Sequence, residues 1–266
     1  MALDKAKKNL QQPLKKENSS ISAKQQSSHL FSGKAEIIDI SESTALQENR
    51  VIAGIREEAR ADIFKILRTK VLQRMRANQW NVIAITSPAP GAGKSLMAAN
   101  LAVSIAQEGN YQVALVDLDF RRPSVYKYFN LHSKRGVMDH LLDETDIHDL
   151  LVYPGIERLR ILPAGTPTRA SSELLSLPKM DALFADFKAS SSNQVIIIDL
   201  PPLLHSDDSM IVLQNVDACI LIVGEGENTG EEIAKCIELI DDDKYMGAVL
   251  NKSTDKKDGS YYYYYY

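Results

Sequence analysis

The sequence lacks any apolar run that approaches the roughly 18 to 20 residues needed to cross a membrane as a helix. Its N-terminal region also lacks the apolar stretch of a secretory signal, so we expect a soluble, cytoplasmic protein. Cysteine is scarce: Cys219 and Cys236 stand in apolar surroundings without metal-ligand spacing, which favours reduced core thiols. A basic excess is missing too, because the net charge is -4, and this argues against nucleic-acid binding.

The 266 residues are 44% hydrophobic and 25% charged, which is ordinary for a globular protein with a sizeable core. Residues 1–50 are rich in Lys, Gln and Ser and are predicted to form a disordered polar extension. Residues 51–252 are predicted to form the folded domain, beginning with an amphipathic helix at 55–77. Residues 253–266 are predicted to be a flexible linker followed by a cluster of tyrosines.

Within the domain, strand-like and helix-like segments alternate. The strand-like segments are nearly continuous apolar runs, as expected for strands that are buried on both faces of a parallel sheet. The pattern predicts an α/β fold with a doubly wound, mostly parallel sheet and helices on both faces. Strands are predicted at 82–86, 113–116, 159–162, 195–198, 218–223 and 247–250, and helices at 95–107, 137–142, 180–187 and 230–240.

The loop between the first of these strands and the helix at 95–107 has the features of a phosphate-binding loop. Gly91 and Gly93 allow backbone N–H groups to approach phosphate oxygens, and the helix N-terminus favours negative charge. Lys94 can reach the β- and γ-phosphates, and Ser95 can ligate Mg²⁺. A glycine turn that merely joins strand to helix is the alternative, but the order of strand, loop and helix favours a nucleotide. The predicted nucleotide-binding residues here are Gly91, Ala92, Gly93, Lys94, Ser95 and Leu96.

Three aspartates follow two other predicted strands. Asp117 and Asp119 come after the strand at 113–116, and Asp199 comes after the strand at 195–198. Because ligands bind at the carboxyl ends of strands in open α/β sheets, these carboxylates should converge on the loop. Oxygen ligands of this kind suit a magnesium-bound nucleotide. Each aspartate could instead only cap the turn that follows it.

Six consecutive tyrosines end the chain, and no packing pattern accounts for them. They follow a polar stretch that resembles a tether, and each phenol can accept a phosphoryl group. A low-complexity terminus or a cloning remnant is the alternative. The predicted phosphorylation sites are Tyr261, Tyr262, Tyr263, Tyr264, Tyr265 and Tyr266.

Taken together, these motifs resemble the bacterial tyrosine kinases of capsule and exopolysaccharide biosynthesis, which are related to partitioning-type P-loop ATPases. The resemblance covers about residues 61–266. It rests on the loop at 90–95, on Asp-Leu-Asp-Phe-Arg-Arg-Pro at 117–123, on Asp-Leu-Pro-Pro at 199–202, and on the terminal tyrosines. Pro88, which replaces the first glycine of the common loop pattern, does not conflict with it, because the family tolerates other residues there.

The resemblance implies an ATP- and Mg²⁺-dependent autokinase that phosphorylates its own tail. It makes Lys94 the phosphate clamp and Ser95 a magnesium ligand. It puts Asp117 and Asp119 at the reacting centre, with one of them as the base and Asp117 also at the metal, and gives Asp199 a place in the magnesium shell. Asn251 matches a position that contacts adenine in related ATPases, although an Asn closing a strand is also common in turns.

The resemblance also implies partners. Asp62, Lys65 and Arg68 stand where the family has a Glu-x-x-Arg-x-x-Arg subunit-contact motif, so a ring-like homo-oligomer with phosphorylation in trans is expected. Lys lacks the bidentate fork of Arg, and a solvated basic helix face is the alternative. Expected partners are the cytoplasmic segment of a membrane co-polymerase as activator, which would recruit the protein to the inner face of the membrane, and a cognate tyrosine phosphatase. The rival function is a switch ATPase of the partitioning type that lacks kinase activity.

Overall fold

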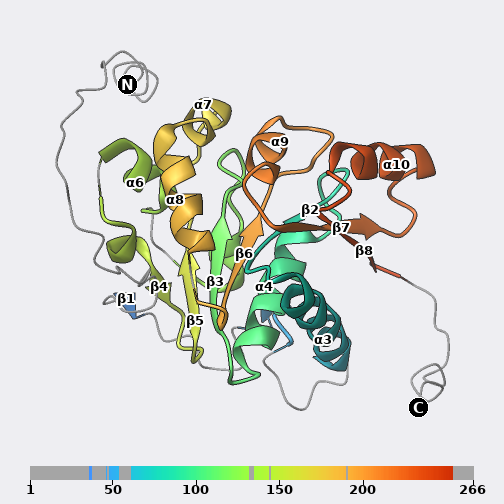
Figure 1. Cartoon of the computed structure of the whole chain (residues 1–266), viewed down its shortest axis with the longest axis horizontal. Helices are drawn as coiled ribbons and strands as arrows, with labels where there is room; N and C mark the ends of the chain where they lie inside the picture. The colour runs from blue at the N-terminus through green and yellow to red at the C-terminus, as the bar shows by residue number, and fades with distance from the viewer. Residues whose placement is uncertain are drawn as a thin grey trace.

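One eight-stranded sheet organises the described part of the chain, with the strand order β1-β4-β5-β3-β6-β2-β7-β8 (Figure 1). The computed structural model describes residues 36–37, 46, 48–53, 61–131, 135–143, 145–189 and 191–253. Every neighbouring pair of strands is parallel except β4 and β5. The strands are β1 (Glu36–Ile37), β2 (Val82–Thr86), β3 (Gln112–Asp117), β4 (Val152–Tyr153), β5 (Leu159–Leu162), β6 (Gln194–Asp199), β7 (Ala218–Gly224) and β8 (Tyr245–Asn251).

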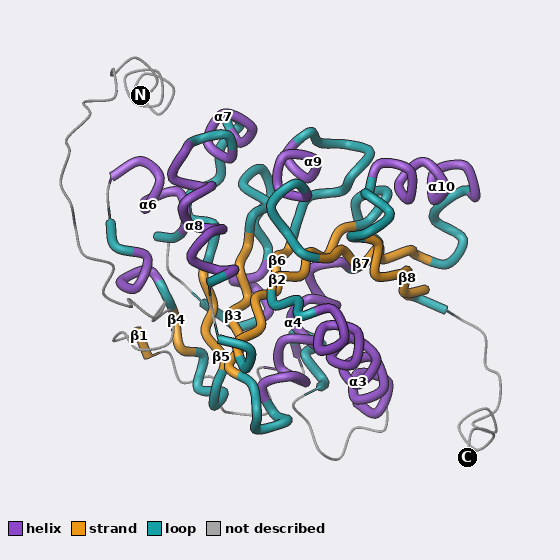
Figure 2. Tube along the Cα trace, viewed as in Figure 1, coloured by secondary structure: helices purple, strands orange, loops and turns teal. Residues whose placement is uncertain are grey.

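Helices cover both faces of this sheet (Figure 2). On one face lie α3 (Ala61–Asn78), α4 (Lys94–Ala106) and the short α5 (Val125–Tyr128). The other face is covered by α6 (Val137–Asp143), the 3₁₀ helix η1 (Ile147–Leu150), α7 (Ser171–Leu175), α8 (Pro178–Lys188), α9 (Asp208–Leu213) and α10 (Gly230–Leu239).

The apolar strands explain the three layers. In β2, Ile83 and Ile85 pack toward α4, whereas Val82 and Ala84 pack toward the opposite helices. Because side chains alternate between the two faces of a strand, an unbroken apolar run supplies both cores at once. The doubly wound, mostly parallel fold predicted from the sequence is therefore confirmed.

The predicted elements are present, and the structure adds several short ones. All six predicted strands occur, and the bounds of each lie within two residues of those predicted. The strands β1 and β4 and the helices α5, η1, α7 and α9 were not predicted, because segments of two to six residues are too short to display a period.

The chain before α3 contributes to the core. Leu46 and Val51 are buried in the layer that contains α4. Asn100 of α4 accepts hydrogen bonds at Oδ1 from the backbone N–H groups of Ile52 (2.8 Å) and Ala53 (3.0 Å). The packed domain thus extends into the segment predicted to be a polar extension, which also supplies β1 at residues 36–37. Residues 1–35, 38–45 and 47 lie outside the described residues, as do residues 254–266.

Two further sequence expectations can be compared with the structure. Cys219 and Cys236 are free, buried thiols, as predicted. Burial raises the pKa of Cys236 to about 11, so this thiol stays protonated at neutral pH.

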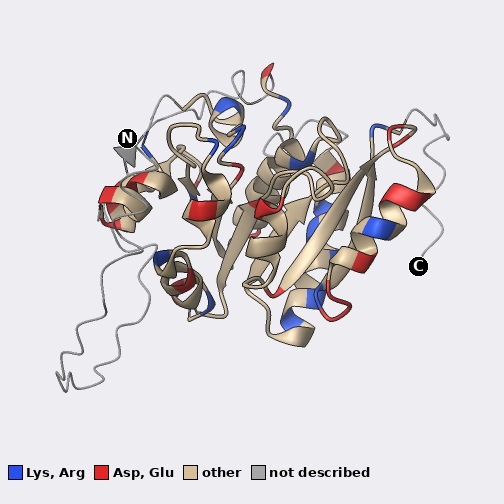
Figure 3. Cartoon of the chain, turned by 90° about the horizontal axis from the view of Figure 1, so that it is seen from above, with Lys and Arg blue, Asp and Glu red and all other residues tan. Residues whose placement is uncertain are grey.

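Acidic and basic residues are interspersed over the fold (Figure 3). Among the described residues, no helix combines the length and the apolar character that crossing a membrane would require.

Candidate nucleotide and phosphoryl-transfer site

The loop between β2 and α4 has the backbone of an anion cradle. Gly91 and Gly93 adopt φ values of +92° and +91°, a region that residues with a side chain rarely enter. A Cβ atom on Gly93 would lie 2.3 Å from Nδ2 of Asn251, so glycine is also required by space. No side chain caps α4 at Gly93, which leaves the N–H groups of its first turn available to an anion.

Lys94 lies at the centre of a buried charge cluster. Its Nζ is 3.1 Å from Oδ2 of Asp119, 3.5 Å from Oδ1 of Asp199 and 3.2 Å from Oγ of Ser95. Burial alone would lower the pKa of Lys94, but the charges of Asp199, Asp119 and Asp117 outweigh it and raise the pKa. The ammonium group therefore keeps its charge and is held where β3 and β6 end beside the loop.

Asp117 is bound by backbone groups. Its Oδ2 accepts hydrogen bonds from the N–H groups of Ser124 (2.9 Å) and Val125 (3.0 Å), and its Oδ1 accepts one from Asp119 (3.1 Å). Burial, with the nearby charge of Asp199, raises the pKa of Asp117 to about 7. The carboxyl group thus fixes the turn that leads into α5 while it remains close to the charge cluster.

Asp199 differs from Asp117 in its hydrogen bonding. It is fully buried, and neither carboxylate oxygen makes a hydrogen bond with the described residues. Burial raises its pKa, and Lys94 and Ser95 lower it in part. Its Oδ1 forms an ion pair with Lys94 (3.5 Å), and a buried carboxylate whose oxygens lack hydrogen bonds is suited to a further cation. Asp199 and Ser95 therefore fit the oxygen-ligand chemistry of Mg²⁺.

No group of three or more His, Cys, Asp or Glu side chains in the described residues could hold a metal ion by itself. Mg²⁺ is usually bound by one or two carboxylates together with substrate phosphates and water. The donor set fits a shared ion better than a metal held by the protein alone. Asp117, whose oxygens already accept three backbone hydrogen bonds, fits direct ligation less well than Asp199.

A cavity of about 540 Å³ opens over this cluster. Asp119 and Lys94 line it directly, whereas Asp117 and Asp199 are not among its lining residues. Its volume lies within the usual range of about 300–1,000 Å³ for small-molecule sites. The remaining lining residues are Pro90, Gly91, Gly93, Ser95, Arg121, Arg122, Ser124, Tyr128, Pro201, Pro202, His205 and Ser206.

The structure brings most of the predicted site residues together. Asn251, at the end of β8, donates a hydrogen bond from Nδ2 to the carbonyl oxygen of Ala92 (2.8 Å). Leu96 lies in the first turn of α4, half-buried. The predicted acceptors Tyr261 to Tyr266 fall outside the described residues.

The predicted subunit-contact residues are on α3, away from this cluster. Lys65 and Asp62 form an exposed ion pair (2.7 Å). Arg68 forms an ion pair with Glu108 (3.1 Å) and donates to the carbonyl oxygen of Ser104 (3.0 Å), so it is already engaged within the chain. Ile63 and Ile66 of the same helix are exposed.

Several lining residues were not predicted. Arg121 follows Asp119 in the quoted motif, yet only the structure connects it to Asp207 and Asp208 (3.3 Å each) and to Oγ of Ser171 (2.7 Å). Asp207 stands at the N-cap position of α9, where its side chain makes no capping hydrogen bond. Partners so distant in sequence leave no local pattern.

The chain is similar to several known proteins. A model of the ParA family, described as NUBPL iron-transfer P-loop NTPase, matches residues 78–253. A putative tyrosine-protein kinase CapB of Staphylococcus aureus is 31% identical over 200 residues, which are 74% of this chain and 86% of that protein. Tyrosine-protein kinase YwqD of Bacillus subtilis (strain 168) is 29% identical over 81% of this chain and 91% of its own length. The crystal structure of the chimerical protein CapA2B2 has a TM-score of 0.70 at 28% identity and covers 84% of this chain and 95% of that one.

Proposed function

Because this chain belongs to the bacterial tyrosine kinases of the P-loop NTPase class, we propose that its substrate is its own C-terminal tyrosine run. The activity itself, transfer of phosphate from a nucleotide to protein tyrosine, is that of the family. The observation that carries the proposal is the convergence of Lys94, Asp119 and Asp199 beneath a cavity at the glycine loop. The tethered residues 261–266 supply six phenols to such a site.

In the transfer, the phenolic oxygen forms a bond to the γ-phosphorus of ATP. The bond from that phosphorus to the β,γ-bridging oxygen breaks, its electron pair leaves with ADP, and the phenol proton passes to a carboxylate. Lys94 and the N–H groups of the loop hold the phosphates and balance their charge. Positioning of this kind supplies most of the acceleration, because the protein contributes little covalent chemistry.

Two aspartates are candidates for the base. Asp119 lines the cavity, where an incoming phenol would arrive. Asp117 has a pKa raised to about 7 by burial and by Asp199, which suits a proton acceptor near neutral pH. Separate Asp117→Asn and Asp119→Asn variants distinguish them, because the variant that lacks the base loses more kcat than affinity for ATP.

A magnesium ion is the proposed cofactor, with Ser95 and Asp199 as the protein groups that would hold it. When bound, the ion neutralises charge on the phosphates. Asp199 supports this assignment because its buried oxygens lack hydrogen-bond partners in the described chain. Asp117 would act beside it by fixing the turn at Ser124 and Val125.

Phosphorylation in trans within a ring-like oligomer is the proposed arrangement. The exposed Ile63 and Ile66 of α3, next to the Asp62–Lys65 pair, give this helix an apolar surface that a second copy could cover. Arg68 is held by Glu108 and would have to exchange partners to contribute. The cytoplasmic segment of a membrane co-polymerase is the proposed activator, and it would recruit the kinase to the membrane.

The test is an anti-phosphotyrosine blot of the purified chain after incubation with ATP and Mg²⁺, beside Asp117→Ala and a form truncated after Ser260. We expect signal in the wild type and loss in both variants. If the wild type is silent, a cytoplasmic segment of a candidate activator is added. Silence that persists while ATP is hydrolysed would replace the kinase proposal with the rival switch ATPase.

A further inference from the structure

A second cavity lies beside the nucleotide cavity and has a different lining. Its volume is about 550 Å³, and its lining residues are Arg121, Arg122, Pro167, Thr168 and Arg169. Arg121 and Arg122 also line the nucleotide cavity, so the two spaces adjoin. Three of its five lining residues are arginines and none is acidic, so its lining is positively charged.

The three arginines differ in how they are paired. Arg121 is neutralised by the buried Asp208 (3.3 Å) and by Asp207 (3.3 Å). The guanidinium groups of Arg122 and Arg169 have no hydrogen-bond or ion-pair partner among the described residues. Two uncompensated guanidinium groups facing one cavity suit a dianionic group with several acceptor oxygens, such as a phosphate ester.

The backbone on both sides of this cavity is fixed. The N–H of Thr168 donates to the carbonyl oxygen of Phe120 (3.0 Å), which joins the loop after β5 to the turn after β3. The N–H of Arg122 donates to Oδ1 of Asp119 (2.9 Å). The same turn therefore holds Asp119, which lines the nucleotide cavity, and Arg122, which lines both cavities. The second cavity therefore has a fixed position relative to the reacting centre.

We propose that this second cavity binds a phosphotyrosine of the C-terminal run and thereby presents a neighbouring tyrosine to the nucleotide cavity. The inference rests on the proposed function. Consecutive residues of an extended chain advance by about 3.3–3.6 Å, so tyrosines one or two positions apart can occupy adjoining cavities. A first phosphorylation then favours the next, because the product of one turnover has a binding site of its own.

The binding test uses the full chain, treated with phosphatase and kept free of nucleotide so that no transfer occurs. The probes are two fluorescent peptides with the sequence of residues 253–266, one carrying a single phosphotyrosine and one unmodified. We expect the phosphorylated peptide to bind about tenfold more tightly, as one charge-assisted hydrogen bond would give. Asp255 and Asp258 are present in both probes, so their charge cancels in the comparison.

Arg169→Ala is the informative variant, since Arg169 lines the second cavity and is absent from the lining of the nucleotide cavity. It should abolish the preference for the phosphorylated probe, and Arg169→Lys should keep part of it. Arg158→Ala is the matched control, because Arg158 precedes β5 whereas Arg169 follows it, and its guanidinium pairs with Glu157. Equal binding of both probes by the wild type, or an unchanged preference in Arg169→Ala, overturns the proposal.

A measurement of ATP affinity distinguishes the second cavity from the phosphate-binding loop. Arg169→Ala should bind a fluorescent ATP analogue as the wild type does; a comparable loss of ATP affinity would assign the cavity to the nucleotide and overturn the proposal. The outcome is also separable from the proposed function. If the chain prefers the phosphorylated probe but never transfers phosphate, only the proposed autophosphorylation of the tail is contradicted. If the chain transfers phosphate but binds both probes equally, only the proposed phosphotyrosine site is contradicted.

Discussion

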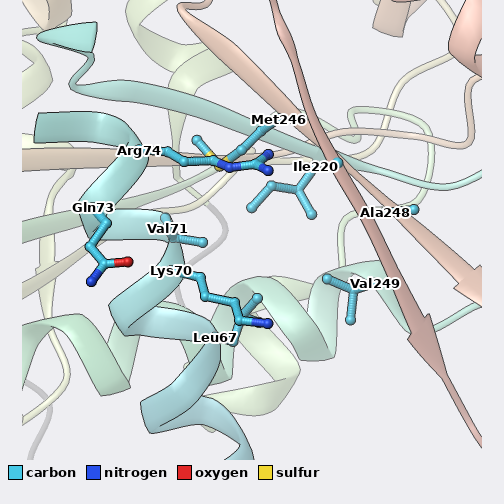
Figure 4. A pocket seen from close by; sticks show the side chains of 10 residues that line it. Leu67, Lys70, Val71, Gln73, Arg74, Ile220, Met246, Ala248 and Val249 are labelled. Carbon is cyan, nitrogen blue, oxygen red and sulfur yellow. The ribbon is translucent and has the colours of Figure 1, made fainter. Parts of the chain in front are cut away.

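Two depressions of similar size on this molecule have different chemistry. The cavity over the glycine loop has a volume of about 540 Å³, and its charged lining residues are Lys94, Asp119, Arg121 and Arg122. The groove between α3 and β8, about 460 Å³, is lined mostly by apolar and backbone groups, with Lys70 and Arg74 as its charged residues (Figure 4). The difference shows that volume does not identify a reactive site here. The convergence of opposite charges at the ends of parallel strands does.

The origin of this difference is the position of each depression on the sheet. The nucleotide cavity lies where β2, β3 and β6 end, so three strands deliver polar residues to one place. The groove lies along β8, an outermost strand of the described sheet, where burial alternates with exposure. Four consecutive residues of β8, from Met246 to Val249, line the groove, where the pairing of β8 with β7 has a register irregularity.

The largest expected effect comes from one substitution made in both depressions. Lys94→Met should lower autophosphorylation at least about 100-fold, because it removes the cation that balances the phosphates. Lys70→Met in the groove should leave the rate unchanged. Initial rates of phosphotyrosine formation measure both, with circular dichroism to confirm folding. Full activity in a folded Lys94→Met protein would rule out the loop mechanism.

Glycine substitutions sharpen the comparison. Gly93→Ala should weaken ATP binding about 10- to 100-fold, since positive φ costs about 1–3 kcal/mol and the new Cβ would meet Asn251. Gly247 in the groove also has positive φ (+140°), but a Cβ there would lie 3.5 Å from the flexible Arg74. Gly247→Ala should therefore reduce stability and spare ATP affinity. Titration with a fluorescent nucleotide tests the pair, and equal losses of affinity would contradict the comparison.

A third change affects stability alone. Met246 is buried beneath the groove, and Met246→Ala should lower the free energy of unfolding by about 2–3 kcal/mol through loss of packing. The affinity for ATP should not change. Urea denaturation and nucleotide titration measure the two quantities. A large loss of ATP affinity would mean that the groove and the nucleotide cavity are coupled.

The smallest effect is expected at the connection that leads into β8. Thr229 and Glu232 form a capping box at the start of α10, in which the Thr229 side chain accepts from the N–H of Glu232 (3.2 Å). Thr229→Ala should cost about 1 kcal/mol of stability, and Thr229→Ser should cost less. Thermal unfolding provides the measurement. No change in the midpoint of Thr229→Ala would show that the cap does not contribute.

Much of the nucleotide site could be predicted because its signals are local. The glycine loop and the aspartates at 117, 119 and 199 each sit beside a long apolar strand, and parallel topology alone brings strand ends together. The partners of Arg121 could not be predicted, because Ser171, Asp207 and Asp208 are 50 to 87 positions away and belong to short helices. The packing of Leu46 was not predicted, since an isolated apolar residue in a polar segment shows no period.

The hydrogen bond from Asn251 to Ala92 has a thermodynamic consequence. Asn251 ends β8 and lies fifteen positions before the final tyrosine, so the root of the tail and the phosphate loop share one contact. If loss of this bond lowers the affinity for a nucleotide, nucleotide binding strengthens the bond by the same factor. One hydrogen bond limits that reciprocal coupling to about 0.5–1.5 kcal/mol, or roughly a 2- to 13-fold change in either affinity.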